Sequence, residues 1–390
     1  MELQLDEQLL DDADALAAAD PASMLRTVAG SGAQVREAAT SASEAGVESL
    51  GDERPRAVIL SAVGSSAASC EVLRALIADD VPLPLIEVSG PSLPRWVGPL
   101  DLVIGVSRSG TARPTLEAVA EAGRRGCRIV TIAGPGSPLA GLSDRVRGLQ
   151  IPVDKASRHT RASLWSLAVP LLAVADALGL ATVPPSEMAL AADRLDAVAE
   201  TCRPSSESFV NPAKRLAIEI AGSLPVVWGA GALCRTAAKR FARQLHANAK
   251  YPALDGSVQE AAHGMVALFD GPFAAAAATD VFHDPFEDET PQSLPLRIML
   301  MRDSDENDGD RALRSAALQL AGERGMRTSE MVAESGRPLE RLAQMVALGD
   351  FASVYLGLGL GLDPSPTRAV LEMKDRIDAV LARRPDFGAS

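Results

Sequence analysis

Apolar residues follow two different spacings along the chain, and the change between them divides it into segments. Residues 5–48 carry apolar side chains three and four positions apart, which predicts two helices separated by Pro21. Further on, short apolar runs alternate with helical stretches; the runs are RAVILSAVG, LPLIEVSG, DLVIGVSRSG and CRIVTIAG. Continuous apolar strands that alternate with helices are typical of a parallel sheet covered on both faces. The first half is therefore predicted to be an α/β domain.

The same pattern returns after the Pro-containing segment ATVPPSEM. Two helices, at about 188–201 and 211–222, precede the strand–turn–helix LPVVWGAGALCRTAAKRFARQL. Its arrangement is similar to that of RAVILSAVGSSAASCEVLRAL in the first half. A further strand, LPLRIMLMRD, and three helical stretches follow. We therefore expect a helical segment over 1–50, a first α/β domain over 51–185 and a second over 186–390.

Composition limits the partners of the chain. The net charge of −13 argues against nucleic acid and anionic membranes, because both need a basic face. A small anionic ligand needs only a few local donors. The acidic start MELQLDEQLLDDADAL lacks the basic flank of a signal peptide, and we find no apolar run of the ~20 residues that span a bilayer, so a cytoplasmic location is expected. The cysteines lie far apart without a CxxC pair and are expected to be reduced: Cys70, Cys127, Cys202 and Cys234.

The segment DLVIGVSRSGTARPTLEAVAEAG has the pattern of an anion-binding loop. A buried strand ends near Val106, and a hydroxyl-rich loop, 107–111, leads into a helix. The free N–H groups at a helix start attract an anion, and hydroxyls in the loop supply further hydrogen bonds. Gly110 lets the backbone approach the ligand closely. Ser and Thr also cap helices without any ligand, which is the alternative interpretation.

Two other loops resemble ligand-binding motifs but lack residues that those motifs require. WGAGALC has Cys234 where the dinucleotide fingerprint requires a third glycine, so no nucleotide cofactor is expected. RDSDENDGDRALR resembles a calcium loop, but its glycine is one position late and Arg314 stands where a bidentate Glu is required. We expect this loop to be solvated. No Cys/His set has zinc spacing, so no metal is expected.

Taken together, several segments resemble the SIS-domain sugar isomerases, and within them the bifunctional phosphoglucose/phosphomannose isomerases. The segments, in order, are VGSSAAS, SRSGTARPT, TRASL, RQLHANAKYPA, QEAAHG and YLGLGLGLDPSPTRAVLEMK. The resemblance covers about residues 50–385. It implies two tandem flavodoxin-like domains, each a three-layer parallel-sheet unit, after an N-terminal helical segment. It also implies a sugar phosphate ligand and a homodimer whose active site is shared between subunits.

The resemblance assigns the phosphate contacts to hydroxyl residues in two loops: Ser107, Ser109, Thr111 and Thr115 in one, Ser65 and Ser66 in the other. It places Arg161 facing the substrate and His263 where ring opening is assisted. Lys374 would reach the active site from the C-terminal region, and Glu260 matches an acid of the family.

Two positions depart from the family pattern. Ala112 stands where the phosphate loop usually has threonine, although Thr111 is adjacent. Ala247, in HANAK, stands where the family has the glutamate that moves the proton during isomerisation. The loss of one general base typically reduces the rate about 10²–10⁴-fold. The hypotheses that remain are a binding protein with little isomerase activity, an isomerase that uses Glu260 or His246 as its base, and a non-catalytic phosphosugar sensor.

The other histidines and Lys250 are less informative. His246 could line the site or lie on a helix surface, whereas His159 and His283, in polar stretches, are expected to be solvated. Lys250 is one of five lysines. It could anchor its loop or line the pocket.

Overall fold

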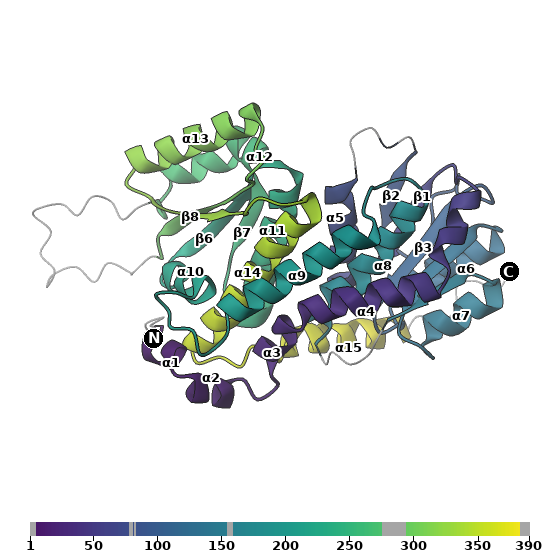
Figure 1. The fold of residues 1–390 in the computed structure, drawn as a ribbon, viewed down its shortest axis with the longest axis horizontal. Helices are drawn as coiled ribbons and strands as arrows, with labels where there is room; N and C mark the ends of the chain where they lie inside the picture. The colour runs from purple at the N-terminus through teal and green to yellow at the C-terminus, as the bar shows by residue number, and fades with distance from the viewer. Residues whose placement is uncertain (1–4, 78–80, 82, 154–158, 275–293, 383–390) are drawn as a thin grey trace, which may run out of the picture.

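The structure is a computed structural model that describes residues 5–77, 81, 83–153, 159–274 and 294–382 (Figure 1). The N-terminal segment holds four α-helices rather than two: α1 (Glu7–Asp11), α2 (Ala13–Ala19), α3 (Met24–Ala29) and α4 (Ser31–Glu44). The first predicted helix breaks at Asp12, whose carboxylate accepts hydrogen bonds from the first-turn N–H groups of α2, and the second breaks at Gly30, which ends α3 and precedes α4. A 3₁₀ turn, η1 (Val47–Asp52), leads to the first strand.

The first sheet contains five parallel strands in the order β2-β1-β3-β4-β5. They are β1 (Val58–Ala62), β2 (Leu85–Val88), β3 (Leu102–Ser107), β4 (Arg128–Ala133) and β5 (Leu149–Pro152). The helices around it are α5 (Ala67–Leu76), α6 (Arg113–Arg124), α7 (Pro138–Val146) and α8 (Leu164–Ala177), with short 3₁₀ turns η2 (Gly64–Ser66) and η3 (Thr160–Ala162). This strand order creates a switch point between β1 and β3, where flavodoxin-like folds bind ligands beyond the carboxyl ends of the strands.

The second sheet repeats this winding with four parallel strands, in the order β7-β6-β8-β9. They are β6 (Leu224–Gly229), β7 (Leu254–Ser257), β8 (Leu296–Arg302) and β9 (Arg327–Val332). The helical elements are α9 (Pro185–Thr201), α10 (Pro212–Ile220), α11 (Gly231–Gln244), the π-helical turn η4 (Leu245–Ala249), α12 (Val258–His263), the 3₁₀ turn η5 (Met265–Asp270), α13 (Asp308–Glu323), α14 (Pro338–Gly359) and α15 (Arg368–Ala382). By position in the winding, β6 corresponds to β1 and β8 to β3.

The two sheets share one core. Residues of α4, α5, α8, α9, α11 and α14 pack between them in a continuous apolar cluster, so a central layer of helices separates the sheets (Figure 1). Smaller clusters cover the outer faces, under α6 and α7 on the first sheet and under α12 and α13 on the second. The α/β class and the parallel sheets were thus predicted correctly.

Three strands escaped the sequence analysis, namely β5, β7 and β9. β5 and β7 have only four residues each, and most of β9 is exposed, so none of them has a long apolar run. One expectation about apolar length was wrong. α14 has the length and composition of a membrane-spanning helix, but 89% of its most apolar window is buried inside the protein.

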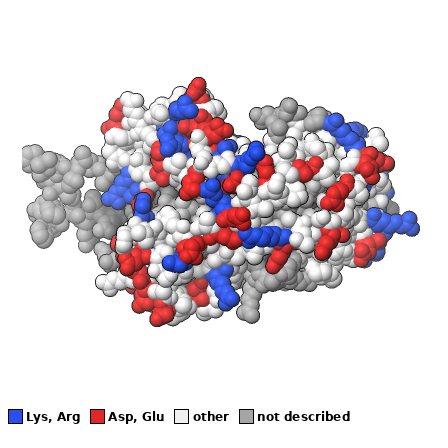
Figure 2. All heavy atoms as spheres, in the orientation of Figure 1, with Lys and Arg blue, Asp and Glu red and all other residues white. Residues whose placement is uncertain are grey.

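Charges on the face shown in Figure 2 are of mixed sign. Acidic side chains gather over the N-terminal helices, where α1 and α2 contribute Glu7, Asp11 and Asp14. Elsewhere opposite charges interleave; Arg36, for example, lies 2.7 Å from Asp193 and 2.8 Å from Asp196.

Candidate functional site

The hydroxyl-rich loop lies at the switch point of the first sheet. β3 ends at Ser107, which is buried, and α6 begins at Arg113 without a side-chain cap. Between them Gly110 adopts φ +65°, and its backbone N–H donates to the Ser107 carbonyl oxygen (2.9 Å). A Cβ at Gly110 would come within 2.0 Å of Ser137 Oγ. Glycine is therefore required here for both conformation and space.

The hydroxyls of this loop differ in exposure. Ser109 and Thr111 are exposed, and their side-chain oxygens lie 2.9 Å apart. Thr115, in the first turn of α6, is fully buried, and among the residues that the structure describes its Oγ1 has no hydrogen-bond partner. A buried hydroxyl without a partner is costly. Thr115 thus has an unused donor and acceptor beside the uncapped start of a twelve-residue helix, which is the arrangement an anion needs.

The neighbouring loop contributes the other serines. Ser65 and Ser66 form η2 directly after β1; Ser65 is exposed and Ser66 is buried. η2 lies against η3, which carries Arg161. The predicted phosphate residues and Arg161 therefore share the carboxyl edge of the first sheet.

Arg161 connects this edge to the second half of the chain. Its Nε donates to Asn248 Oδ1 (2.7 Å), and its Nη2 donates to the carbonyl oxygens of Pro364 and Ser365, the latter at 2.9 Å. The side chain is half-buried, and burial lowers the pKa of its guanidinium. Arg161 therefore sits beside η4, the turn that contains Ala247.

Lys250 anchors a loop. It adopts the left-handed conformation at φ 53°, and its Nζ donates to the carbonyl oxygens of Asp363 (2.8 Å), Pro364 (3.2 Å) and Asn248 (3.3 Å). Burial lowers the pKa of Lys250, and the charge of Arg161 lowers it further. Together Arg161 and Lys250 fix the linker between α14 and α15.

Ala247 lies in the π-helical turn η4 and is half-buried. π-helical turns are rare and occur frequently at functional sites. Its neighbour His246 is exposed, and His246 Nε2 lies 3.1 Å from the Ala253 carbonyl oxygen. This contact ties His246 to its own loop and fixes the orientation of its ring.

Glu260 has a structural role. Its carboxylate completes a capping box with Ser257 at the start of α12 and lies 2.9 Å from Arg235 Nη2. The hydrogen bonds from Ser257, and then the charge of Arg235, lower the pKa of Glu260. A lowered pKa makes a carboxylate a weaker base, so Glu260 is poorly suited to remove a C–H proton.

His263 and Ala247 are separated along the chain by β7, because η4 precedes this strand and α12 follows it. His263 is exposed at the end of α12.

Lys374 is exposed on α15, and within the described residues it has no hydrogen bond or ion pair. α15 also exposes a row of apolar side chains that are 49–60% accessible: Val370, Leu371, Met373, Ile377 and Val380. Val370, Met373, Ile377 and Val380 are spaced by three and four residues, which places these four along one side of the helix.

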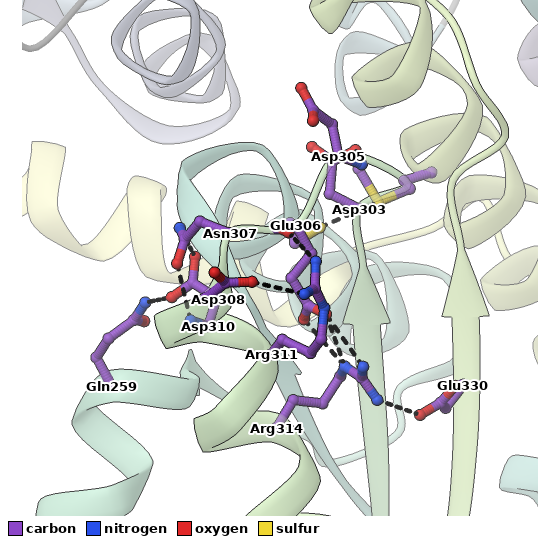
Figure 3. A network of polar contacts seen from close by, with 12 residues as sticks. Gln259, Asp303, Asp305, Glu306, Asn307, Asp308, Asp310, Arg311, Arg314 and Glu330 are labelled. Atoms are coloured by element: carbon purple, nitrogen blue, oxygen red, sulfur yellow. Dashed lines mark hydrogen bonds and ion pairs between the residues drawn. The ribbon is translucent and has the colours of Figure 1, made fainter.

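The acidic loop after β8 is solvated over much of its length, as expected, with the side chains of Asp305 and Asp308 83% and 97% exposed, but Glu306 is an exception. Glu306 is 5% exposed, and its carboxylate lies 2.9 Å from Arg314 Nε (Figure 3). Arg311 pairs with Asp308 at 2.6 Å, and Arg341 pairs with Asp303 at 2.9 Å. The arginine that breaks the calcium motif is thus a partner of the loop's own carboxylates, a contact that sequence spacing does not show.

Three further expectations have clear outcomes. His159 is half-buried, with Nε2 3.0 Å from the Ala22 carbonyl oxygen, so its prediction as solvated was wrong. His283 lies outside the described residues. All four cysteines are free thiols, and burial raises the pKa of Cys70 to about 12.

Comparison with known proteins shows which family the chain resembles. Residues 209–377 match the model of the bacterial phospho-glucose isomerase C-terminal SIS domain. The chain is 23% identical over 320 residues to the bifunctional phosphoglucose/phosphomannose isomerase of Caldicellulosiruptor bescii, covering 82% of this chain and 89% of that protein. It is 24% identical over 294 residues to the enzyme of that name from Aquifex aeolicus, covering 75% and 81%.

The second half of the chain thus matches a SIS-domain model, and most of the chain is similar to bifunctional phosphoglucose/phosphomannose isomerases. Solved structures share the fold of this chain at low identity. A hypothetical protein of Thermus thermophilus superposes with a TM-score of 0.70 at 15% identity, covering 96% of this chain and 95% of that one. Tagatose-6-phosphate ketose/aldose isomerase from Escherichia coli gives 0.61 at 14% identity, covering 87% and 92%.

Proposed function

We propose that this SIS-domain protein is a cytoplasmic protein that binds a hexose 6-phosphate and has little or no isomerase activity. The phosphate would contact Ser107, Ser109 and Thr115, with Arg161 facing the sugar. The observation that carries the binding proposal is Thr115 Oγ1, which is buried and unpartnered at the uncapped start of α6. Thr111, Ser65 and Ser66 lie in the same pair of loops at the β1–β3 switch point.

Thermal unfolding with added ligand tests the binding. Fructose 6-phosphate at about 100 times its Kd should stabilise the fold by about 2.7 kcal/mol. Glucose 6-phosphate, mannose 6-phosphate and inorganic phosphate should be compared in parallel, because the sugar is not fixed by the loop. If none of them shifts the unfolding temperature, the binding proposal fails.

Ala247 supports the absence of catalysis. Aldose–ketose isomerisation needs a base that removes a C–H proton and returns it to the neighbouring carbon, and a methyl group cannot do this. The substitutes are constrained: Glu260 by its capping box and Arg235, His246 by the Ala253 carbonyl. A coupled assay that starts from fructose 6-phosphate should show no turnover, and ordinary isomerase rates would contradict the proposal.

Restoring the carboxylate is the sharper test. Ala247→Glu should raise isomerase activity by up to about 10²–10⁴-fold if the remaining groups are in place. Ala247→Gln is the matched control, because it has nearly the same size but no base. Equal activity in the two variants would show that the missing carboxylate is not what limits turnover.

We also propose a homodimer in which His263 and Lys374 serve a site shared between two copies. Two observations support this. The side chains of His263 and Lys374 are both exposed, and α15 exposes apolar side chains that a second copy would cover. Light scattering should give a dimer, and Ile377→Asp should give a folded monomer; a monomeric wild type would rule the dimer out.

The alternative of a non-catalytic phosphosugar sensor shares the binding site and differs in its output. The exposed row on α15 favours this alternative as a second candidate, because a ligand could bias what covers it. Addition of fructose 6-phosphate would then change the dimer dissociation constant, whereas a simple binding protein would show no change.

A further inference from the structure

A closed circuit of hydrogen bonds lies between the two sheets, beneath the candidate site. Arg240 on α11 and Asp350 on α14 form a bidentate ion pair, with Nε–Oδ1 at 2.9 Å and Nη2–Oδ2 at 2.6 Å. Their side chains are 9% and 5% exposed. Gln244 Nε2 donates to the same carboxylate at 3.1 Å. Burial raises the pKa of Asp350, and the charge of Arg240 opposes that rise.

Each residue of this ion pair is linked to Arg161 by hydrogen bonds. On one side, Arg240 Nη2 also donates to the backbone carbonyl oxygen of Arg161 (3.1 Å). On the other side, the Asp350 carbonyl oxygen accepts from Ser353 Oγ (2.8 Å), which in turn accepts from Asn248 Nδ2 (2.9 Å). Asn248 Oδ1 then accepts from Arg161 Nε (2.7 Å). The circuit therefore holds Arg161 by its backbone and by its guanidinium.

The circuit leaves one nitrogen of Arg161 available. Nε is bound by Asn248, and Nη2 by the carbonyl oxygens of Pro364 and Ser365. Within the described residues Nη1 has no hydrogen bond, and no carboxylate lies within ion-pair distance of Arg161. Because a guanidinium is planar, two fixed nitrogens determine the direction of the third.

Stability alone does not account for a buried ion pair. Burial removes two charges from water, and apolar residues of similar volume often give an equally stable core. What the ion pair provides, and an apolar pair cannot, is a fixed hydrogen-bond geometry around Arg161. We propose that Arg240, Asp350 and Ser353 are positioning residues that aim Arg161 Nη1 at the sugar portion of the ligand. This inference rests on the proposed hexose phosphate site and identifies the residues that hold Arg161 in place there.

The double substitution Arg240→Met/Asp350→Leu tests the inference, because it should retain the fold. By calorimetric titration, fructose 6-phosphate should bind about tenfold more weakly, which corresponds to about 1.4 kcal/mol. Inorganic phosphate needs only the β3–α6 loop, so its affinity should not change. The matched control is Arg314→Met/Glu306→Leu, which removes an equally buried pair remote from Arg161; it should alter neither affinity.

Several results would overturn the inference. One is unchanged affinity for fructose 6-phosphate in the folded double variant. Another is an equal loss of affinity for fructose 6-phosphate and inorganic phosphate, because a general loss of rigidity in the protein would then be the cause. If the double variant does not fold, Ser353→Ala decides, with an expected loss of about threefold to tenfold for one buried hydrogen bond; no loss overturns the inference. A wild type that binds neither ligand overturns the proposed function as well, whereas normal wild-type binding with unaffected variants overturns only this inference.

Discussion

The loops after β3 and after β8 occupy corresponding places in the two sheets and have opposite chemistry. The first is rich in hydroxyls, has a required glycine, Gly110, and leaves Thr115 Oγ1 unpartnered. The second is rich in carboxylates, which pair with arginines of the same region (Figure 3). The first loop is open to an anion, whereas the second pairs Asp303, Glu306 and Asp308 with arginines. The same strand order therefore supports a candidate binding site in the first sheet and a network of ion pairs in the second.

The difference extends to the second loop of each switch point. Beside the hydroxyl loop lie Ser65 and Ser66, after β1. Beside the carboxylate loop lies Gly231, after β6, and a Cβ there would be 3.4 Å from Asp310 Oδ2. The carboxylate of Asp310 therefore lies close to the start of α11, where a negative charge is favourable. Topology thus creates the place, and side chains decide whether a ligand can use it.

The largest expected effect comes from the carboxylate loop. Glu306→Gln should lower the free energy of unfolding by about 3 kcal/mol, because Arg314 loses its main buried partner and keeps only Glu330 at 3.4 Å. Urea unfolding measures the loss, and phosphosugar affinity should stay constant. Asp308→Asn, in an exposed pair of the same loop, is the control and should cost less than about 1 kcal/mol. Weaker ligand binding in Glu306→Gln would contradict the expectation that the carboxylate loop has no role in ligand binding.

The second prediction introduces a carboxylate into the hydroxyl-rich loop after β3. Ser109→Asp places a negative charge beside the bound phosphate, and like charges about 4 Å apart repel by up to about 4 kcal/mol near a protein surface. Fructose 6-phosphate should therefore bind about 100-fold more weakly. Ser109→Asn has the same size without the charge and should bind much better than the Asp variant. Similar affinities would place the phosphate elsewhere.

The smallest effect isolates one hydroxyl. Thr115→Val removes a buried oxygen that has no partner, so the ligand-free protein should gain up to about 1 kcal/mol in stability, while ligand affinity should fall about threefold to tenfold. Thr131, on β4, is equally buried and equally unpartnered. Thr131→Val should give the same gain without the loss of affinity. A loss of affinity in both variants would mean that Thr115 has no special relation to the ligand.

Sequence determined much of this protein through local patterns. Apolar runs specified the central strands β1, β3, β4, β6 and β8, and the hydroxyl-rich loop around Gly110 followed one of them. Short or exposed strands such as β9 escaped, because their side chains lack a continuous apolar pattern. The identity of residue 247 is also visible in the sequence, since the absence of a carboxylate needs no coordinates.

Tertiary structure decided which groups remain free to act. Only packing shows that Thr115 Oγ1 is unpartnered, that Glu260 is held by Ser257 and Arg235, and that Arg314 neutralises Glu306. The circuit that holds Arg161 joins residues 79 to 110 positions apart. Sequence periodicity reports neighbours on one helix or strand, whereas the hydrogen-bond partner of a buried polar group comes from whichever distant element packs against it.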